Sequence, residues 1–456
     1  MRTFITTLAL LCYFQSYAQS VISLEQAAQL TFSNNSTIKA IEHHNSEAQY
    51  NRKAAVGLFF PQINIHGAWI HSQKNISIDA NPLKGLLKDF NITPLLGLDW
   101  SYKIQNRTFS FLEADITIPI FTGGKIIAAN RAAKSNQRAI SAQGVIESQK
   151  IFTTLVNRYF GYILATDAVT VRNDAVKGLK QHLNDILALQ ENGLATNAEV
   201  LYVKYSLSEA ESLLNDAIAE RATIHKALCT TIGIDTLHKA STNIFIVDKI
   251  ESLSHFQALA EQNNPQIEYI KEQVNLAKEN IAVNRADFSP QIAAIAGGAL
   301  TQHVTELLPR WAIGIGVNFK LFDGSRREFK YLAAKQTFAR VKELETTVEQ
   351  DIRLLLESLY NNCTSALSHC QSAESSISFA KEYLRMKQIA FDQGVATSTD
   401  VVDATLNLAR SQIEHLKAAY QFDINLAQLL EASGCSYDFF KYSNSVNKRV
   451  ISYENN

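Results

Sequence analysis

The chain has 456 residues, of which 46% are hydrophobic, and contains only 7 prolines and 18 glycines. Few helix-breaking residues in so long a chain favour long, uninterrupted helices. The 43 Lys and Arg residues nearly balance the 44 Asp and Glu residues, giving a formal net charge of -1 at pH 7, which argues against the basic field that a nucleic-acid partner requires.

The first residues have the pattern of a secretory signal peptide. Arg2 precedes a largely apolar run over residues 4–14, and Ser16-Tyr17-Ala18 supplies the small residues of a cleavage site. The run is too short to cross about 30 Å of hydrocarbon. We therefore predict a signal peptide over residues 1–18, cleaved after Ala18, and export of the mature chain.

The remainder of the chain repeats itself. ENGLATNAEVL at 191–201 and DQGVATSTDVV at 392–402 carry Gly, Ala and Thr at matching places 201 residues apart. A Pro-Gln-Ile triplet at 61–63 recurs at 290–292, and a Phe-x-Gly triplet at 121–123 recurs at 322–324. Such self-similarity predicts two copies of one structural unit. The predicted organisation is a first repeat over 19–233 (helix, two strands, long helix, helix), a connection over 234–251, a second repeat over 252–434 and a C-terminal tail over 435–456.

Each copy begins with a helical segment that is predicted to bend. Pro265 lacks a backbone donor and restricts Asn264 before it, so it is expected to break the helix of the second copy. Asn34-Asn35-Ser36 marks the same place in the first copy.

After the Pro-Gln-Ile triplets the apolar period changes to two. Apolar and small or polar residues alternate over 311–321, less cleanly over 109–120 and 63–69, and least decisively over 291–300. The first copy has extra residues around 73–107, which predicts a loop insertion. Four such strands in an exported chain, with no visible partner for their apolar faces, predict a membrane β-barrel. Because the smallest barrels have about eight strands, several chains must combine, and three would supply twelve.

Helical periodicity returns after the Phe-x-Gly triplets. Ala132, Ala139 and Ile146 recur every seven residues in the first copy, and the second copy has a similar seam that includes Leu355 and Leu359. This pattern favours coiled-coil packing. Residues 124–191 and 324–392 contain no proline, so each stretch is predicted to be one long helix.

No Walker loop, H-E-x-x-H, G-x-S-x-G or zinc-spaced cysteine motif is present. We therefore predict no enzymatic activity, no metal site and no cofactor. Cys363 and Cys370 lie seven residues apart on a predicted helix, too far for a disulfide. Two states are open for Cys229 and Cys435, a disulfide and a pair of buried free thiols, and the free thiols are favoured.

The order and duplication of these motifs resemble the TolC-type outer-membrane efflux protein family. The resemblance is carried by S-L-E-Q-A at 23–27, the two Pro-Gln-Ile triplets, I-P-I-F-T-G-G at 118–124 with L-F-D-G at 321–324, and the two G-x-A-T turns. It implies a mainly α fold with a membrane β-barrel portion. Duplicated long helical hairpins would form a trimeric α-helical tunnel under a twelve-stranded barrel, to which each chain gives four strands.

The resemblance also implies a function and a location. The chain would be the outer-membrane channel of a tripartite efflux or type I secretion system, with its helical part in the periplasm. It would export substrates passively as a homotrimer in outer-membrane lipid, with a periplasmic adaptor protein and an inner-membrane transporter as partners. The alternative is a structural or adhesive periplasmic coiled-coil protein without a channel. A periplasmic adaptor ranks lower because adaptors carry one hairpin and this chain has two.

By the same resemblance, a periplasmic gate falls on Asp400 and Asp403, with Glu199 at the linking position after the first turn. Asp400 and Asp403 share a helix face, and threefold symmetry would gather six carboxylates round one mouth. They are alternatively helix N-terminal acids favoured by the helix dipole. The turns would dock the adaptor, or else hold only glycine C-caps; the candidate docking residues are Gly193, Leu194, Thr196, Gly394, Val395 and Thr397.

Overall fold

The computed structural model describes residues 21–84, 98–237, 239–301 and 309–453. The predicted signal peptide over 1–18 lies outside these residues. The chain divides into two units, which cut across the two sequence repeats. Unit 1 comprises Met1–Ser46, Ala139–Lys271 and Leu344–Asn456, and unit 2 comprises Glu47–Arg138 and Glu272–Glu343.

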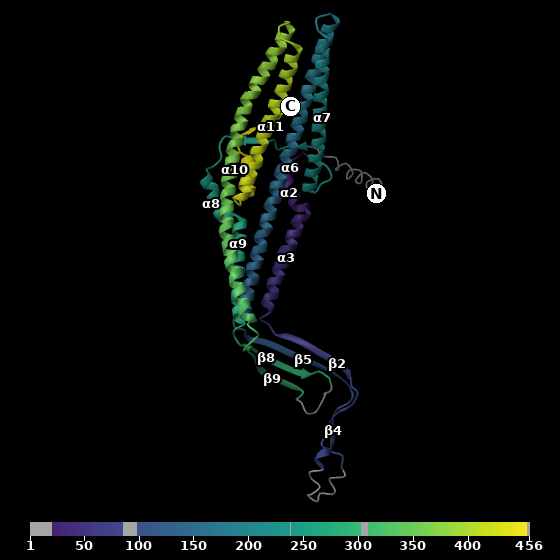
Figure 1. The fold of residues 1–456 in the computed structure, drawn as a ribbon, viewed down its shortest axis with the longest axis vertical. Helices are drawn as coiled ribbons and strands as arrows, with labels where there is room; N and C mark the ends of the chain where they lie inside the picture. Colours follow the sequence, from purple (N-terminus) through teal and green to yellow (C-terminus); the bar gives the residue numbers. More distant parts are fainter. Residues whose placement is uncertain (1–20, 85–97, 238, 302–308, 454–456) are drawn as a thin grey trace, which may run out of the picture. The chain divides into compact units, whose positions relative to one another are not determined.

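Each copy of the repeat contributes two short and two longer helices (Figure 1). They are α2 (Leu24–Asn34), α3 (Ser36–Gly57), α6 (Lys125–Glu191) and α7 (Asn197–Ile232) in the first copy, and α8 (Leu253–Asn263), α9 (Pro265–Ala286), α10 (Arg326–Asp392) and α11 (Ser398–Ala432) in the second. The two predicted long helices are confirmed, since α6 and α10 each run for 67 residues. The predicted alanine seam of α6 is buried at Ala132 and Ala139. In α10 the prediction was wrong at Leu355, which is exposed, because its neighbour Leu356 turns toward the core instead.

The predicted bends are confirmed, and each one packs against the helix end of its own copy. The Asn34 side-chain amide lies 3.5 Å from the carbonyl oxygen of Gly233, and the Asn264 amide donates to the carbonyl of Ala432 at 2.6 Å. The bend at the asparagine and the glycine-terminated end of the last helix both recur in the sequence. Within each copy, these two features are therefore in contact.

The core of unit 1 is rich in aromatic side chains from α6 and the C-terminal half of the chain. Tyr159 is fully buried, and its hydroxyl donates to the carbonyl of Ile22 at 2.7 Å. Asp423 is also fully buried and accepts a hydrogen bond from the N–H of Phe245 at 3.2 Å. Phe439, in the short helix α12 (Phe439–Ser443), lies among these rings with no exposed surface. The residues after α11 are thus part of this core.

Short strand pairs hold the connection between the repeats. Strand β6 (Lys239–Ala240) pairs in parallel with β1 (Val21–Ile22), and β7 (Phe245–Val247) pairs antiparallel with β10 (Lys448–Val450). All four described cysteines, Cys229, Cys363, Cys370 and Cys435, are free thiols, as favoured by the sequence, although Cys435 is only half-buried. Burial raises the pKa of Cys363 to about 12, so this thiol stays protonated and unreactive at neutral pH.

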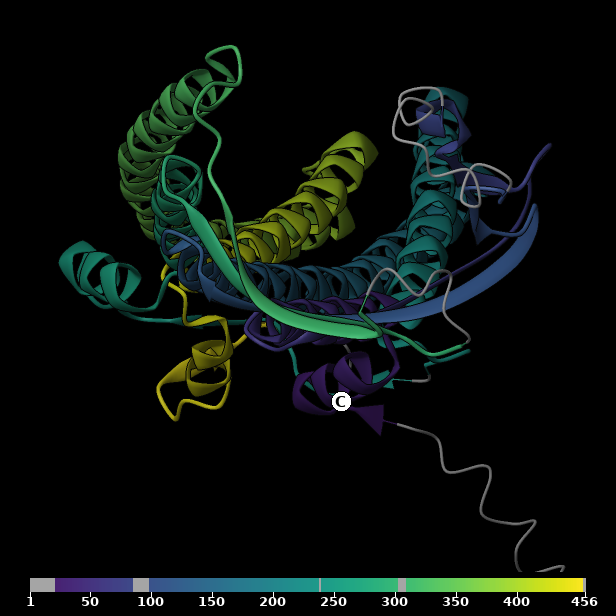
Figure 2. The same ribbon diagram turned by 90° about the horizontal axis from the view of Figure 1, so that it is seen from below.

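Unit 2 contains a curved antiparallel sheet, seen nearly along its surface in Figure 2. Its strands are β2 (Gln62–His71), β5 (Thr108–Phe121), β8 (Gln291–Ala299) and β9 (Trp311–Asn318), in the order β2-β5-β8-β9. The alternating segments are therefore strands, although β9 ends three residues before the predicted Leu321. The insertion of the first copy includes a second pair, β3 (Ile76–Asp79) and β4 (Ser101–Gln105). Among the described helices, none has an apolar stretch long enough to cross a membrane.

Replacing Gly434 by alanine is expected to destabilise unit 1 strongly. Gly434 has φ of 77°, and an added Cβ would lie 2.3 Å from the backbone oxygen of Asn263. The left-handed conformation alone costs a non-glycine residue about 1–2 kcal/mol, and the clash adds to this cost. Gly193→Ala is the matched control, because Gly193 has a similar φ of 75° and open space round its Cβ. Thermal unfolding should show a clearly larger loss for Gly434→Ala, and equal losses would contradict the contact between bend and helix end.

Candidate functional site: an apolar sheet face and two hairpin turns

The register of the sheet in unit 2 gathers the apolar residues of all four strands on one face. Ile63 pairs with Ile116, Ile116 with Ala296, and Ala296 with Ile313. Directly paired residues point to the same side of a sheet, so the four apolar half-faces merge into one surface. We call it the apolar face; its large members are Ile63, Ile65, Trp69, Leu112, Ile116, Ile118, Ile292, Trp311, Ile313, Ile315 and Val317.

The apolar face is uncovered in a single chain. Along β9, Trp311, Ile313, Ile315 and Val317 are 72%, 76%, 70% and 65% exposed. A soluble monomer rarely exposes a contiguous apolar surface of this kind. The sheet therefore needs an apolar environment on this side.

The opposite face of the sheet carries most of its polar and small residues, together with a few apolar ones, Ile70, Phe109, Phe111 and Ile295. The Asn64 amide donates to one carboxylate oxygen of Asp115 at 3.0 Å, and His66 lies 2.8 Å from the other. Further along, Gly314 and Gly316 occupy this face of β9. One side of the sheet thus suits lipid and the other suits water.

The first hairpin turn, between α6 and α7, is closed by a glycine and a capping box. Gly193 has φ of 75°. The Glu199 carboxylate accepts from the N–H of Thr196 at 2.8 Å, while the Thr196 hydroxyl accepts from the N–H of Glu199 at 3.3 Å. The bonds from Thr196 lower the pKa of Glu199. Leu194, at the apex, is 75% exposed. Of the predicted site residues, Gly193, Thr196 and Glu199 therefore serve the turn itself.

The second turn, between α10 and α11, repeats this construction and adds an ion pair. Gly394 has φ of 71°, and Thr397 and Asp400 form the same reciprocal capping box. The Lys387 ammonium lies 2.8 Å from the Asp400 carboxylate and, together with Thr397, lowers the pKa of Asp400 to about 2. Val395 is 81% exposed at the apex. The sequence did not identify this ion pair, because Lys387 lies near the end of α10 and Asp400 lies in the first turn of α11.

Asp403 is not part of the cap and faces the other hairpin. The Tyr202 hydroxyl of α7 donates to its carboxylate at 3.1 Å. Tyr202 and Asp403 are separated by 201 residues, the offset of the repeat, so they are equivalent positions of the two copies. The duplication has brought them face to face, whereas Glu199 makes its described contacts within its own turn.

A second contact between the hairpins involves His182, which the sequence did not single out. His182 lies on α6 with 6% of its surface exposed, and its Nε2 is 2.8 Å from the Ser398 hydroxyl of α11. Its ring packs edge-on against Phe391 of α10 at a centroid distance of 4.8 Å. Burial lowers the pKa of His182, while Ser398, Asp185 and Asp392 act in the opposite direction. His182–Ser398 and Tyr202–Asp403 thus connect the two hairpins near their turns.

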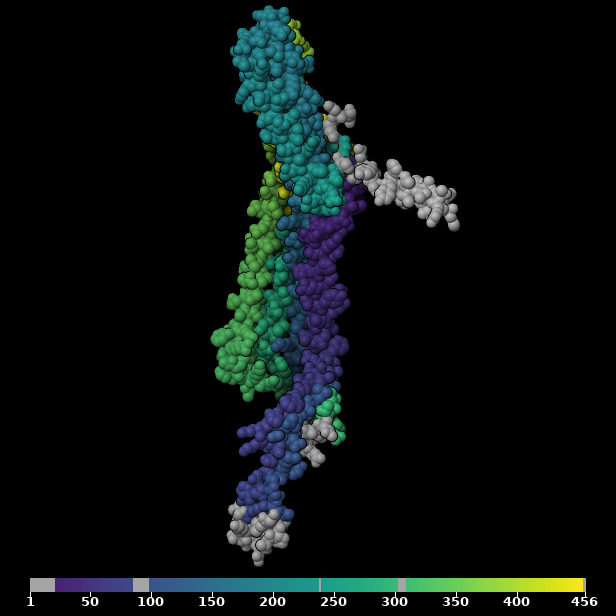
Figure 3. Space-filling view, turned by 90° about the vertical axis from the view of Figure 1, so that its right-hand side faces the viewer, coloured from purple at the N-terminus to yellow at the C-terminus, as the bar shows by residue number. Residues whose placement is uncertain are grey.

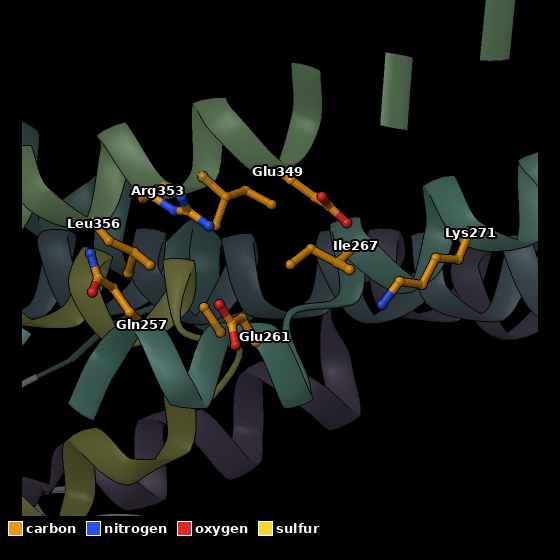
Figure 4. Close-up of a pocket in the computed structure, with 9 residues that line it drawn as sticks. Gln257, Glu261, Ile267, Lys271, Glu349, Arg353 and Leu356 are labelled. Atoms are coloured by element: carbon orange, nitrogen blue, oxygen red, sulfur yellow. The ribbon is translucent and has the colours of Figure 1, made fainter. Parts of the chain in front are cut away.

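Unit 1 also contains an open cavity of about 280 Å³ between α8, α9 and α10 (Figure 4). Ile267 and Leu356 are apolar residues of its lining, and Figure 4 shows Glu261 of α8 below Arg353 and Glu349 of α10. Its charged side chains balance, with two acidic and two basic residues, so the cavity has no preference for a charged ligand. Among the described residues, no group of three His, Cys, Asp or Glu side chains could hold a metal ion.

Comparison with known proteins gives a family match over most of the chain. A family described as outer membrane efflux protein matches residues 27–233 and 258–435. The Escherichia coli (strain K12) outer membrane protein TolC is 20% identical over 387 residues, covering 78% of this chain and 77% of its own. The Pseudomonas aeruginosa alkaline protease secretion protein AprF is 20% identical over 290 residues, so the chain spans 60% of the length of that relative.

A solved structure has the same fold. The Campylobacter jejuni CmeC outer membrane channel superposes with a TM-score of 0.76 at 14% identity, covering 92% of this chain and 89% of that one. At this identity the match reports the fold alone. It agrees with the predicted mainly helical architecture with duplicated hairpins.

The stability of the contact between the hairpins is expected to fall with acidification. The pKa of buried His182 is below its usual value. Below about pH 6.5, the state in which the hairpins have separated therefore binds more protons than the closed state, and the stability of the contact decreases as pH falls. The equilibrium constant for opening rises by at most about tenfold per pH unit. Hydrogen exchange of α6 near His182, corrected for intrinsic rates, should accelerate between pH 8 and pH 5.5. His182→Gln, which keeps a hydrogen-bonding group but cannot titrate, should lose this acceleration. An unchanged pH response in the variant would show that other groups control the contact.

Proposed function

The chain belongs to the outer membrane efflux protein family, and we propose that it is the outer-membrane channel of a tripartite efflux or type I secretion system. It exports substrates passively after an inner-membrane transporter and a periplasmic adaptor protein have delivered them. The observation that carries this proposal is the two-faced sheet of unit 2, with an exposed apolar side and a polar side. We propose no enzymatic step.

The apolar face supports a position in lipid. The four strands have 8–14 residues, and a tilted membrane strand needs about 9–11. Large exposed aromatic residues lie where strands and helices join: Phe60, between α3 and β2, is 62% exposed, Phe322, between β9 and α10, is 81% exposed, and Phe329, in the first turn of α10, is 68% exposed. Membrane barrels carry girdles of aromatic residues where the membrane meets water. The boundary of the outer membrane therefore lies at these phenylalanines.

The open edges of the sheet support a homotrimer. Strands β2 and β9 are the edge strands, and unpaired backbone groups in hydrocarbon cost several kcal/mol each. Three copies that pair β9 of one chain with β2 of the next close a twelve-stranded barrel, with the polar faces lining the channel. The long helices then continue this channel as a tunnel.

Exposed apolar residues on the hairpins of unit 1 also support self-association. On α7, Leu201 and Tyr205 are 56% and 61% exposed. Figure 3 shows the teal surface of the hairpin to which α7 belongs. On α10, Phe379 and Met386 are 70% and 57% exposed. Such residues on two separate helices provide contact surfaces for neighbouring copies. A coiled-coil protein without a channel would account for the helices but not for the apolar sheet face.

The assembled protein is expected to be a trimer that inserts into lipid. Native mass measurement in mild detergent should give three chains, and reconstituted vesicles should retain the protein after an alkaline wash. Replacing Ile313 and Ile315 by Asn should reduce insertion, because polar groups on the lipid side must be desolvated. Replacing Gly314 and Gly316 by Ser, on the opposite face, is the control and should insert normally. A monodisperse monomer of the unaltered chain would contradict the proposal.

We further propose that Asp400 and Asp403 form the periplasmic gate, with Glu199 beside it. Three copies of α11 would bring six of these carboxylates together and create a cation-attracting mouth. Lys387 is paired with Asp400, whereas Asp403 accepts a hydrogen bond from the neutral hydroxyl of Tyr202. Asp403 therefore contributes more to the field of the mouth than Asp400.

Block of the channel by a trivalent cation tests the gate. In planar bilayers, with the cation added from the hairpin side, Asp403→Asn should weaken the block roughly tenfold, as expected for the loss of about 1.4 kcal/mol of attraction, and Asp400→Asn should weaken it less. Asparagine keeps hydrogen-bonding capacity at the cap, so α11 should remain intact. Glu414→Gln, an exposed acid elsewhere on α11, is the control. Equal block of all variants would identify the two aspartates as helix-end acids only.

We also propose that the two turns dock the adaptor through Leu194 and Val395, held in place by Gly193, Thr196, Gly394 and Thr397. Leu194→Glu and Val395→Glu should abolish efflux in cells, since a charge at an apolar contact must be desolvated without a partner. Trimer assembly and membrane insertion should be unchanged. Val446→Glu is the control, because Val446 is 98% exposed and belongs to neither turn, lying between α12 and β10. Full efflux by these variants would show that the turns only cap the helices and do not dock the adaptor.

A further inference from the structure

A basic cavity lies in unit 2, where the sheet meets the beginnings of the long helices. It has a volume of about 340 Å³. Five of its lining side chains are basic and two are acidic, Asp287 and Asp323. The basic residues are Lys125, Lys320, Arg326, Arg327 and Lys330. Because cations outnumber carboxylates, the cavity carries a net positive charge.

Two of the five cations are held by the protein itself. Lys125 pairs with Asp287 at 2.8 Å. Arg327, whose side chain is only 13% exposed, pairs with Glu328 at 3.2 Å and donates to the carbonyl of Leu321 at 2.9 Å. Its guanidinium also lies 5.1 Å from the ring centroid of Phe288. These contacts fix the wall of the cavity and leave its net charge to the other three cations and to the Asp323 carboxylate.

Lys320, Arg326 and Lys330 have no carboxylate within ion-pair distance among the described residues. Arg326 is also the first residue of α10, a helix of 67 residues whose positive dipole end lies at this cavity. Three cations without an ion pair, against the one carboxylate of Asp323, lie beside a helix N-terminus. Together they attract an anion with several oxygen acceptors, and a phosphate group has this chemistry.

The residues that alternate with these cations in the chain are apolar and exposed. Phe319 is 47%, Leu321 81%, Phe322 81% and Phe329 68% exposed. A free phosphate ion would satisfy the cations but leave these side chains in water. A phospholipid would satisfy both, since its headgroup is anionic and its chains are apolar.

We propose that this cavity binds the headgroup of an anionic phospholipid, whose acyl chains lie against the neighbouring exposed Phe and Leu side chains. The inference rests on the proposed function, because it requires unit 2 to lie in a membrane. The bound lipid then fixes the depth at which the sheet sits and covers charge that hydrocarbon would not tolerate.

Lipid binding to the full-length assembly tests the proposal. Native mass spectrometry would count phosphatidylglycerol and phosphatidylethanolamine bound at equal concentrations, for the unaltered protein and for two double variants. Lys320→Gln with Lys330→Gln removes two unpaired cations of the cavity. Arg131→Gln with Lys134→Gln removes the same charge from exposed positions of α6 in the same unit and is the matched control.

The unaltered protein should bind phosphatidylglycerol preferentially, and the cavity variant should bind it roughly thirtyfold more weakly, as expected for two surface lysines acting on an anionic lipid. The control variant should retain the preference. Equal binding of both lipids by the unaltered protein, or an equal loss in the control, would overturn the proposal.

Inorganic phosphate distinguishes a lipid site from a simple anion site. If millimolar phosphate displaces phosphatidylglycerol fully, the cavity recognises the free anion and the lipid proposal is wrong; retention of the lipid supports it. The same samples report membrane insertion. Failure of the unaltered chain to insert would contradict the proposed function, whereas insertion without a preference for the anionic lipid would contradict this inference alone.

Discussion

The antiparallel register of the sheet in unit 2 is the constraint on which the rest of this protein depends. Ile63, Ile116, Ala296 and Ile313 follow one another across the four strands, so every strand turns its apolar side the same way. A slip of one residue in any pairing would move that strand's apolar residues to the polar face. The register makes one face compatible with lipid and the other with water, and it leaves β2 and β9 as the open edges of the described sheet.

The helical hairpins show how a duplicated element keeps its geometry while its chemistry diverges. Both turns use a left-handed glycine followed by a reciprocal capping box, Thr196 with Glu199 and Thr397 with Asp400. Only the second turn has another acid three residues further on, Asp403. The equivalent residue in the first copy is Tyr202, whose hydroxyl donates a hydrogen bond to Asp403. The cap is thus a shared structural device, and the pair Tyr202–Asp403 is a specialised contact that exists because the two copies differ.

At the boundary between sheet and helices, one short stretch of chain exposes both charged and apolar side chains. The residues after β9 alternate between cations, such as Lys320, and exposed apolar side chains, such as Leu321. An alternation of this kind is unfavourable in a uniform solvent, because either the charges or the apolar groups are poorly solvated. It is favourable where headgroups and acyl chains meet, since each class of side chain then finds its own partner.

The sequence by itself determined the features that depend on local periodicity and local backbone chemistry. These are the long helices, the bends at Asn35 and Pro265, the alternating strands, the glycine turns and the duplication that relates them. Their order also sufficed for the family resemblance. The tertiary structure alone decided which residues meet across long separations: the register of the sheet, the ion pair of Lys387 with Asp400, the contact of His182 with Ser398 and the burial of Phe439. The reason is physical, since helix and strand periods report only which side of an element is apolar, whereas a partner is chosen by packing between elements that lie far apart in the chain.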